Sequence, residues 1–485
     1  MTMRPTILLI FCILLTSLSS VGQDLFGYRN SNYAGVSGID LNPASIADSR
    51  YKADVNLFGG SVSIYQNYYG MDTKALKKPF SDNSAFNDSD FFDKYVTRRD
   101  GDFDKSLNFN ASLYLPSFMF TISEKDAVGF TSRIRSYTNI DGVGQDLIDL
   151  MEEGFDDSTF FDRRLNNGPL SVQSMSWIEY GASYGRVVLD QDKHFFKAGG
   201  RVKFIQGIQS AYFYSDAIEY EFAAKDSILI INTDISYGHS DNFNLADNYN
   251  PKFEFASKPT VGIDIGFVYE FRPDRDDYTY EKTKENFVDR RDQNKYKFRI
   301  GASLLDVGRV KFKKADGSQN IRADLDSFWD LDTLDVLENI NDLDKIIADQ
   351  FVFTEQGGES YTQSLPTALS LQFDYHIAKD FYVNFTPFWS FQRKNKESKI
   401  AGITAYSFTP RWDHKWFGVF VPLTVDGLKN FNYGLTARLG PIVIGTRNLK
   451  PIFKAGSTYG VDFFALVKVP IPHGKPKKKA ETFIF

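Results

Sequence analysis

One pattern in the sequence is typical of a catalytic nucleophile. Gly181-Ala182-Ser183-Tyr184-Gly185 matches the G-x-S-x-G motif, in which a sharp turn between a strand and a helix exposes the serine. Here the motif lies inside an alternating run, and no helical pattern follows it. Small residues on one face of a strand explain it better, so we expect no catalytic residue and no enzyme activity.

Metal chemistry is supported no better. The 5 histidines are scattered and none belongs to an H-E-x-x-H pair. Asp100, Asp102 and Asp104 are spaced like the start of a calcium loop, but an EF-hand needs Gly at its sixth position and Glu at its twelfth. This chain has Lys105 and Ala111 there. We expect a solvated acidic loop, with a loosely bound surface cation as the alternative, and neither a metal site nor a cofactor.

A set of charged residues recurs on the polar faces of alternating runs. It comprises Arg133, Arg135, Arg201, Lys203, Asp264, Glu270, Asp374 and Arg438. If these faces line an enclosed space, opposite charges can pair across it and close it, or the basic members can attract an anionic headgroup. Pairing is the commoner fate of charges held in a confined space.

The amino-acid composition limits which kinds of secondary structure can carry these charges. Aromatic residues make up 16% of the 485 residues, yet the mean hydropathy is only −0.32, so apolar and polar residues must be interleaved. The longest apolar run, Ile7–Leu15, is far shorter than the roughly 20 residues of a spanning helix. A net charge of −6 gives no general attraction for nucleic acid, and the aromatic content excludes a disordered polymer.

The N-terminus has the features of an export signal. Arg4 supplies the positive region, Ile7–Leu15 the apolar region and Ser20-Val21-Gly22 the cleavage site. We therefore expect residues 1–22 to be a signal peptide. The single cysteine, Cys12, leaves with it, so the exported chain has no disulfide. A bacterial envelope fits best.

The strongest pattern beyond the signal is strand-like alternation. In Val261–Arg272, apolar residues occupy every second position, with Gly262, Asp264 and Gly266 between them, and Leu369–Ile377 repeats the arrangement. A soluble sandwich buries such an apolar face, whereas a transmembrane barrel turns it toward lipid. Sandwich strands average about five or six residues and spanning strands need roughly 9–11. The alternating runs reach the longer value, which favours the barrel.

Short polar turns near 123–126, 190–193, 378–380 and 412–414 predict one rim, which we assign to the periplasm. The predicted strands are 52–69, 107–122, 127–140, 174–189, 195–209, 259–272, 297–314, 364–377, 381–394, 399–411, 415–424, 431–439, 442–447 and 459–471. They make a fourteen-stranded antiparallel transmembrane β-barrel, an all-β fold over residues 51–472.

The remaining segments are assigned to loops and ends. Long extracellular loops are expected near 70–106, 141–173, 210–258 and 315–363, with helix in Gln145–Glu153 and Asp330–Phe351. Asp216–Ser236 is interpreted as a hairpin that projects from such a loop, although its arms could instead be wall strands. The connection Pro273–Lys295 is long, although it falls on the periplasmic side, where short turns are expected. Residues 473–485 are predicted to be a basic periplasmic tail.

Residues 23–50 precede the first strand and contain a capped helix start. Asn42 can cap a short helix in which Pro43 takes the first position and Ala44–Asp48 continues it. This segment resembles the N-terminal hatch of FadL-like outer-membrane barrels, which plugs their lumen. The runs Gly301–Gly308 and Gly460–Phe464 are similar to uncharacterised members from Bacteroidota, a branch that includes PorV-type barrels of the type IX secretion system. On that resemblance, Asn42, Pro43 and Ala44 are hatch residues.

The resemblance implies two functions in the outer membrane of a Gram-negative bacterium, where lipid surrounds the barrel. One is uptake of small hydrophobic molecules through a hatch-gated lumen. The other is a sealed accessory barrel that scaffolds or shuttles envelope proteins. A transporter should have an apolar pocket near the hatch and a kink or gap in a strand wall. A charge-paired, fully plugged interior would argue against transport.

Overall fold

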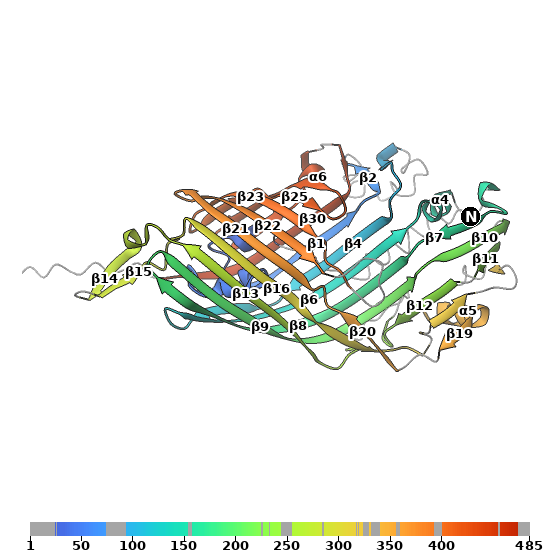
Figure 1. The fold of residues 1–485 in the computed structure, drawn as a ribbon, viewed down its shortest axis with the longest axis horizontal. Coiled ribbons are helices and arrows are strands. Elements are labelled where there is room, and N and C mark those ends of the chain that lie inside the picture. Colours follow the sequence, from blue (N-terminus) through green and yellow to red (C-terminus); the bar gives the residue numbers. More distant parts are fainter. Residues whose placement is uncertain are drawn as a thin grey trace, which may run out of the picture.

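A computed structural model describes residues 25, 27–73, 94–153, 158–224, 227–231, 233–243, 255–283, 286–316, 318, 320–323, 329–330, 340–355, 359–391, 400–453 and 456–473. The predicted signal peptide and nearly all of the predicted tail lie outside these residues. Within them, one large antiparallel sheet closes on itself as a barrel (Figure 1). Among the helices in the described ranges, none is long and apolar enough to cross a membrane.

The wall of the barrel has fourteen strands, as predicted, and closes where β30 pairs with β1. In order around the ring they are β1 (Tyr51–Gln66), β4 (Lys105–Tyr114) with β5 (Ser117–Thr121), β6 (Asp126–Val143), β8 (Leu170–Gln191), β9 (His194–Ser215), β13 (Thr260–Phe271), β16 (Phe298–Lys313), β20 (Ser360–Ser364) with β21 (Ala368–Ala378), β22 (Phe381–Ser390), β23 (Ala405–Asp413), β24 (Phe417–Phe420) with β25 (Leu423–Asp426), β26 (Phe431–Tyr433) with β27 (Leu435–Leu439), β28 (Ile442–Thr446) and β30 (Gly460–Pro472).

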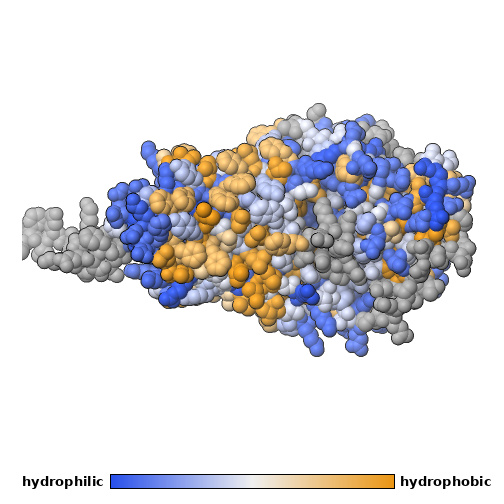
Figure 2. All heavy atoms as spheres, in the orientation of Figure 1, coloured by the Kyte–Doolittle hydropathy of each residue, from blue (hydrophilic) through white to orange (hydrophobic). Residues whose placement is uncertain are grey.

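The alternating residues of these strands face in the directions that a membrane barrel requires. On β13, Val261, Ile263, Ile265 and Phe267 point outward with 44–58% of their surface exposed, whereas Asp264 is buried. In a soluble sandwich these four apolar side chains would be buried instead. Figure 2 shows the outward apolar residues gathered in a band across the visible face of the barrel. This band is the lipid-facing surface.

Polar surface borders the apolar band on both sides (Figure 2). We call the end with the tight turns, such as the one between β8 and β9, the short-turn end, and the opposite end the long-loop end. β8 and β9 have 22 residues each, about twice the roughly 9–11 needed to cross a bilayer. The wall therefore continues well beyond the band at the long-loop end.

A small hairpin projects from the short-turn end (Figure 1). It belongs to the connection Pro273–Lys295 and consists of η7 (Arg275–Tyr278), β14 (Thr279–Thr283) and β15 (Asn286–Asp289). An ion pair of 2.9 Å between Arg275 and Asp190 holds its base on the β8–β9 turn. This connection therefore has structure of its own, which explains its length on a side of short turns.

The long-loop end carries additional sheets and helices. Their bounds are β2 (Tyr69–Asp72), β3 (Val96–Arg98) and β29 (Ser457–Thr458) in one sheet; β7 (Arg164–Asn167), β10 (Ile218–Ala224), β11 (Ser227–Ile231) and β18 (Trp329–Asp330) in another; β12 (Thr233–His239), β17 (Asn320–Ala323) and β19 (Val352–Glu355) joined to the wall; and α4 (Gln145–Glu153), η6 (Ser158–Phe160), α5 (Ile340–Gln350) and α6 (Lys450–Phe453).

Three loop predictions need correction. The projecting hairpin is present as β10–β11, but Thr233–Ser236 belong to β12, which pairs with the end of β9 and extends the wall. The described part of the predicted helix is Ile340–Gln350, and Asp330, its predicted first residue, pairs with β11 as part of β18 instead; residues 331–339 lie outside the described ranges. The strand predicted from residue 399 begins at Ala405.

Candidate functional site

The N-terminal segment, residues 27–50, lies inside the barrel. It forms three short 3-10 helices, η1 (Tyr28–Asn30), η2 (Gly35–Asp40) and η3 (Pro43–Ile46), and not one helix continuing to Asp48. The segment contacts strands on every side of the ring. The Asn30 amide reaches Asn384 of β22, for example, and Lys468 of β30 donates to the carbonyl oxygen of Ala34 at 2.7 Å.

Asn42 both caps η3 and attaches it to the wall. Its Oδ1 accepts a hydrogen bond from the backbone N–H of Ala44 at 3.0 Å, as the sequence predicts for a cap. Its Nδ2 donates to the carbonyl oxygens of Phe267 and Ala302 at 3.0 and 3.3 Å, and to Gln372 Oε1 at 3.0 Å. A single side chain therefore joins the segment to three neighbouring wall strands, β13, β16 and β21.

Pro43 and Ala44 pack against a wall position without a side chain. An ideal Cβ built on Gly199 of β9 would lie 2.7 Å from the backbone nitrogen of Ala44. Pro43 and Ala44 are both buried, and Ala44 has no exposed surface. Glycine at position 199 is what allows the two backbones to approach so closely.

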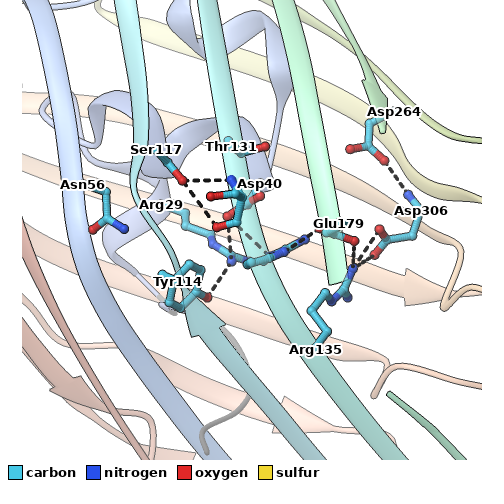
Figure 3. A network of polar contacts seen from close by, with 12 residues as sticks. Arg29, Asp40, Asn56, Tyr114, Ser117, Thr131, Arg135, Glu179, Asp264 and Asp306 are labelled. Atoms are coloured by element: carbon cyan, nitrogen blue, oxygen red, sulfur yellow. Dashed lines mark hydrogen bonds and ion pairs between the residues drawn. The ribbon is translucent and has the colours of Figure 1, made fainter. Parts of the chain in front are cut away.

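The central cluster is an ion-pair network between η2 and the wall (Figure 3). At its centre, Asp40 lies 2.6 Å from Arg201 and 3.4 Å from both Arg29 and Arg133. All four side chains are at most 8% exposed. Burial alone would raise the pKa of Asp40, but these guanidinium groups outweigh it and hold the pKa well below its ordinary value.

The central cluster continues along the wall toward the long-loop end. Arg201 also contacts Asp264 at 2.5 Å, and Lys203 contacts Asp264 at 2.8 Å as well as Asp306. Arg135 lies 2.9 Å from Asp306, while Arg133 lies 2.6 Å from Glu179. Each of these charges thus has a partner of opposite sign, and the network links η2 with β6, β8, β9, β13 and β16.

Glu179 and Asp306 are two members that the sequence reasoning missed. Glu179 has the same parity on β8 as Gly181 and Ser183, so alternation could have identified it as inward-facing. Asp306 had no such signal, because β16 has a bulge there and the residue has a φ of 54°. The backbone N–H of Asp306 donates to Asp264 at 2.6 Å, which holds this bulge against β13.

Glu270 and Asp374 pair with basic residues other than Arg133, Arg135, Arg201 and Lys203, and belong to two other clusters. In the rim cluster, Arg272 bridges Glu270 at 2.5 Å and Asp48 of the N-terminal segment at 2.7 Å. Arg50, Lys295 and Arg272 hold the pKa of Asp48 well below its ordinary value, against the opposing effect of burial. Near Glu270, Lys197 donates to the carbonyl oxygen of Ala47 at 2.8 Å.

The side cluster contains Asp374 and Arg438. Arg411 and Arg299 lie 2.7 and 2.6 Å from Asp374, and Arg299 also donates to the carbonyl oxygen of Asn30 at 2.7 Å. Arg438 lies 3.2 Å from Asp413, which accepts hydrogen bonds from Ser31 and Asn32. The structure therefore places the eight predicted charges in three clusters, each touching the N-terminal segment.

An apolar layer lies next to the central cluster. Trp177 is fully buried, its indole N–H donates to Glu179 at 3.0 Å, and the Arg135 guanidinium lies 4.8 Å from its ring. The layer consists of Tyr137, Met175, Trp177, Ile205, Ala256, Val310, Phe312, Leu365 and Ile400. The β8–β9 pairing shifts register between Ser176 and Trp177, and the ring of Trp177 points inward next to this shift.

Residues 400–404 lie across the barrel on the long-loop side of this layer. Ala401 exchanges hydrogen bonds of 3.0 and 3.1 Å with the side chain of Asn139 on β6, and its carbonyl also accepts from Asn108 on β4. Ile400 is fully buried within the apolar layer. This short stretch therefore crosses the lumen from the β22–β23 side to the opposite wall.

Two cavities are best defined among the described residues. The first, of about 50 Å³, lies against the N-terminal segment and is lined by charged and amide side chains such as Arg50, Glu270 and Arg299. The second, of about 210 Å³, lies beside residues 400–404 and is lined by Leu107, Ala401, Ile403 and Leu428 together with polar groups. The cavity at the segment is thus small and polar.

Four wall strands are interrupted, but hydrogen bonds bridge the interruptions. Between β26 and β27, the Gly434 N–H donates to Pro422 at 2.8 Å. Between β4 and β5, the Leu115 N–H donates to Ser132 at 3.0 Å, and between β24 and β25 the Val421 N–H donates to Pro410 at 3.1 Å. Between β20 and β21, Leu365 donates to Gly308 at 3.0 Å. These strands bend, and the wall stays bonded at each bend.

The serine of the G-x-S-x-G pattern lies in the wall, and the acidic loop lies between two strands at the long-loop end. Ser183 lies in the middle of β8, at a buried inward position, with no helix after it. Asp100, Asp102 and Asp104 lie in the connection between β3 and β4. Within the described part of the chain, no group of three or more His, Cys, Asp or Glu side chains is arranged to hold a metal ion.

Residues 43–446 match the Family of unknown function (DUF5723). The chain belongs to this family. The DUF5723 match runs from the first residue of η3 to the last residue of β28, so it includes most of the wall and the end of the N-terminal segment. No curated protein matches the sequence significantly.

Some solved structures are similar to this DUF5723 protein. They include the CymD monoaromatic hydrocarbon channel (9% identity, TM-score 0.34, covering 94% of this chain and 99% of that chain), a Pseudomonas aeruginosa FadL homologue (9%, 0.40, 93% and 97%) and the Pseudomonas putida toluene transporter TodX (9%, 0.30, 93% and 98%). At such identities and TM-scores, these names say nothing about the ligand or activity of this chain.

Proposed function

We propose that this protein is a closed barrel of the outer membrane, in a bacterium of the Bacteroidota type, that acts as an accessory to other envelope proteins. The observation that supports this is the ion-paired lumen. The N-terminal segment and the wall share three clusters of buried charges, and an apolar layer and residues 400–404 lie beyond them.

Energetics supports a lumen that stays closed. Removing one partner of a buried ion pair costs about 3–5 kcal/mol, because the other charge is left uncompensated in a poorly solvated site. Withdrawal of the N-terminal segment would separate Asp40 from Arg201 and Asp48 from Arg272 together. A small hydrophobic molecule has no charged group with which to replace these contacts.

The long-loop end offers a well-packed surface for a partner. A cluster of Leu150, Phe160, Leu165, Tyr220 and Phe222 packs beneath the sheet that contains β10 and β11. A second cluster joins Ile235 and Ile321 to Leu343 and Ile347 of α5. Surfaces supported in this way suit a lasting protein contact.

Site-specific photo-crosslinking in cells tests this proposal. A photoreactive residue in place of the exposed Lys345 on α5 should give one discrete protein adduct, and the same residue at the exposed Lys125, at the short-turn end, should give none. The adduct should survive purification in stoichiometric amount. Absence of any adduct at the long-loop end, together with protein-dependent uptake of a lipophilic tracer by liposomes, would contradict the proposal.

A conduit for small hydrophobic molecules is the second candidate, and the cavity of about 210 Å³ favours it. An apolar cavity of about 150 Å³ is enough to bind benzene, so the volume would admit one aromatic ring beside Ala401, against a lining that also includes Asn108, Asn139 and Asp141. Under this proposal, Ala401→Phe should fill the cavity and abolish tracer uptake. Ala217→Phe, at an exposed position of the long-loop end, should leave uptake unchanged.

A further inference from the structure

The connection between β28 and β30 exposes two large apolar side chains. Ile452 and Phe453 in α6 are 61% and 65% exposed, which places them among the most exposed apolar residues of the described chain. The turn that presents them is regular, because both backbone N–H groups donate to the carbonyl oxygen of Leu449, at 2.9 and 3.0 Å. A soluble surface would not be expected to hold two such side chains outward.

This turn lies at the edge of the lipid-facing band. The backbone N–H of Leu449 donates to the carbonyl oxygen of Tyr433 at 2.8 Å, which places the turn beside β26. Phe431, two residues from Tyr433, and Val425 on the paired β25 belong to the band, with 53% and 48% exposure. In the figures, α6 lies near the level at which the apolar band gives way to polar surface.

Basic side chains accompany the apolar pair. Arg99 donates to the carbonyl oxygen of Leu428 at 3.1 Å and to Asn430 at 2.8 Å, which holds it beside the turn between β25 and β26. Lys429 is exposed at that turn. Burial and the nearby Arg99 lower the pKa of Lys450, the first residue of α6. The positive charges of Arg99 and Lys450 are therefore close enough to disfavour each other.

We propose that this connection anchors the barrel to the lipid leaflet on the long-loop side. Ile452 and Phe453 enter the acyl layer, and Lys450 and Lys429, with Arg99 behind them, bind the phosphate of an anionic lipid headgroup. Apolar side chains just below the headgroups and cations level with them are the usual arrangement of a membrane interface. The occupant of this patch is lipid because the patch continues the surface that already faces lipid.

Fluorescence quenching by labelled lipids tests the position of the turn. A Cys12→Ser background removes the only cysteine, so a bimane fluorophore can be attached at Phe453→Cys. Control sites are Ile444→Cys, lipid-facing on β28, and Lys313→Cys, exposed at the long-loop end of β16. In phosphatidylcholine vesicles with acyl-chain nitroxide lipid, position 453 should be quenched like position 444. Quenching at the level of position 313 would overturn the proposal.

A second measurement tests the headgroup contact. With nitroxide-labelled phosphatidylglycerol in place of labelled phosphatidylcholine, quenching at position 453 should increase. Lys450→Gln or Lys429→Gln should lower this preference for the anionic lipid about fivefold, the effect of one lysine at an anionic surface, and Lys313→Gln should not. No preference in the parent protein, or one indifferent to all three substitutions, would refute the headgroup contact. Inorganic phosphate that abolished the preference would identify a free-phosphate site.

Discussion

Asp40→Asn tests whether the central cluster holds the N-terminal segment in the lumen. The substitution keeps the size of the side chain and removes its charge, so Arg201, Arg29 and Arg133 are left facing one another within 2.6–3.4 Å of the former carboxylate. Breaking a buried ion pair in this way costs about 3–5 kcal/mol. The population with an undocked segment should therefore rise roughly 150-fold to 5,000-fold.

Thiol labelling measures that population. Ser37 is buried in η2, so a cysteine at this position in the Cys12→Ser background should react with a maleimide only when the segment leaves the wall. Asp40→Asn should speed labelling by the factor above. The matched control is Asp126→Asn, which breaks a solvent-exposed pair with Arg186 at 3.0 Å and should change labelling less than about fivefold. Equal rates for the two variants would refute the view that buried charge pairing holds the segment.

Three further predictions concern the N-terminal segment and its packing inside the barrel. Gly199→Ala should raise Ser37→Cys labelling and lower the melting temperature, because its Cβ would lie 2.7 Å from the Ala44 nitrogen. Gly168→Ala, which has open space around it, should change neither quantity. Equal effects of the two substitutions would contradict the close packing of η3. Trp177→Ala should lower the free energy of urea unfolding by about 3–5 kcal/mol, and Trp177→Phe by clearly less; equal losses would show that packing of the ring does not matter. The pKa values of Asp40 and Asp48 are depressed in the folded protein. The stabilisation that these two carboxylates give the folded state is therefore complete above the ordinary aspartate pKa of about 4 and is lost as the pH falls below it. Ser37→Cys accessibility, assayed with a thiol reagent active in acid, should rise below about pH 4, and Asp40→Asn/Asp48→Asn should flatten that rise; an identical rise in the double variant would contradict the assignment.

The sequence predicts the wall well because alternation is a direct consequence of strand geometry. Val261–Arg272 shows the inward and outward faces of β13 almost without error, and the same parity was available for Glu179. The prediction fails where the strand departs from the period of two. The bulge at Asp306 turns inward a side chain that a regular count places outward, whereas Trp177 keeps the parity of Glu179 because the register shift beside it falls on β9.

The ion-pair partners across the lumen could not be predicted from the sequence, for a different reason. Which carboxylate meets which guanidinium depends on the stagger of the ring and on the path of the N-terminal segment. Glu270 therefore pairs with Arg272, two residues along the chain, and Asp374 with Arg411 of β23, and neither partner belongs to the set of charges predicted from the sequence. Residues 400–404 read as the beginning of a strand, yet hydrogen bonds to Asn139 draw them across the lumen instead.

The contacts of the N-terminal segment constrain the order of biogenesis. Asn30 bonds to a residue 354 positions later in the chain, and Tyr28 to one 440 positions later. The first part of the chain to emerge must wait for the last strands before its polar groups are satisfied. The seam between β1 and β30 then has to close around an interior that is already occupied, so late folding steps decide whether the early residues are trapped inside or left outside.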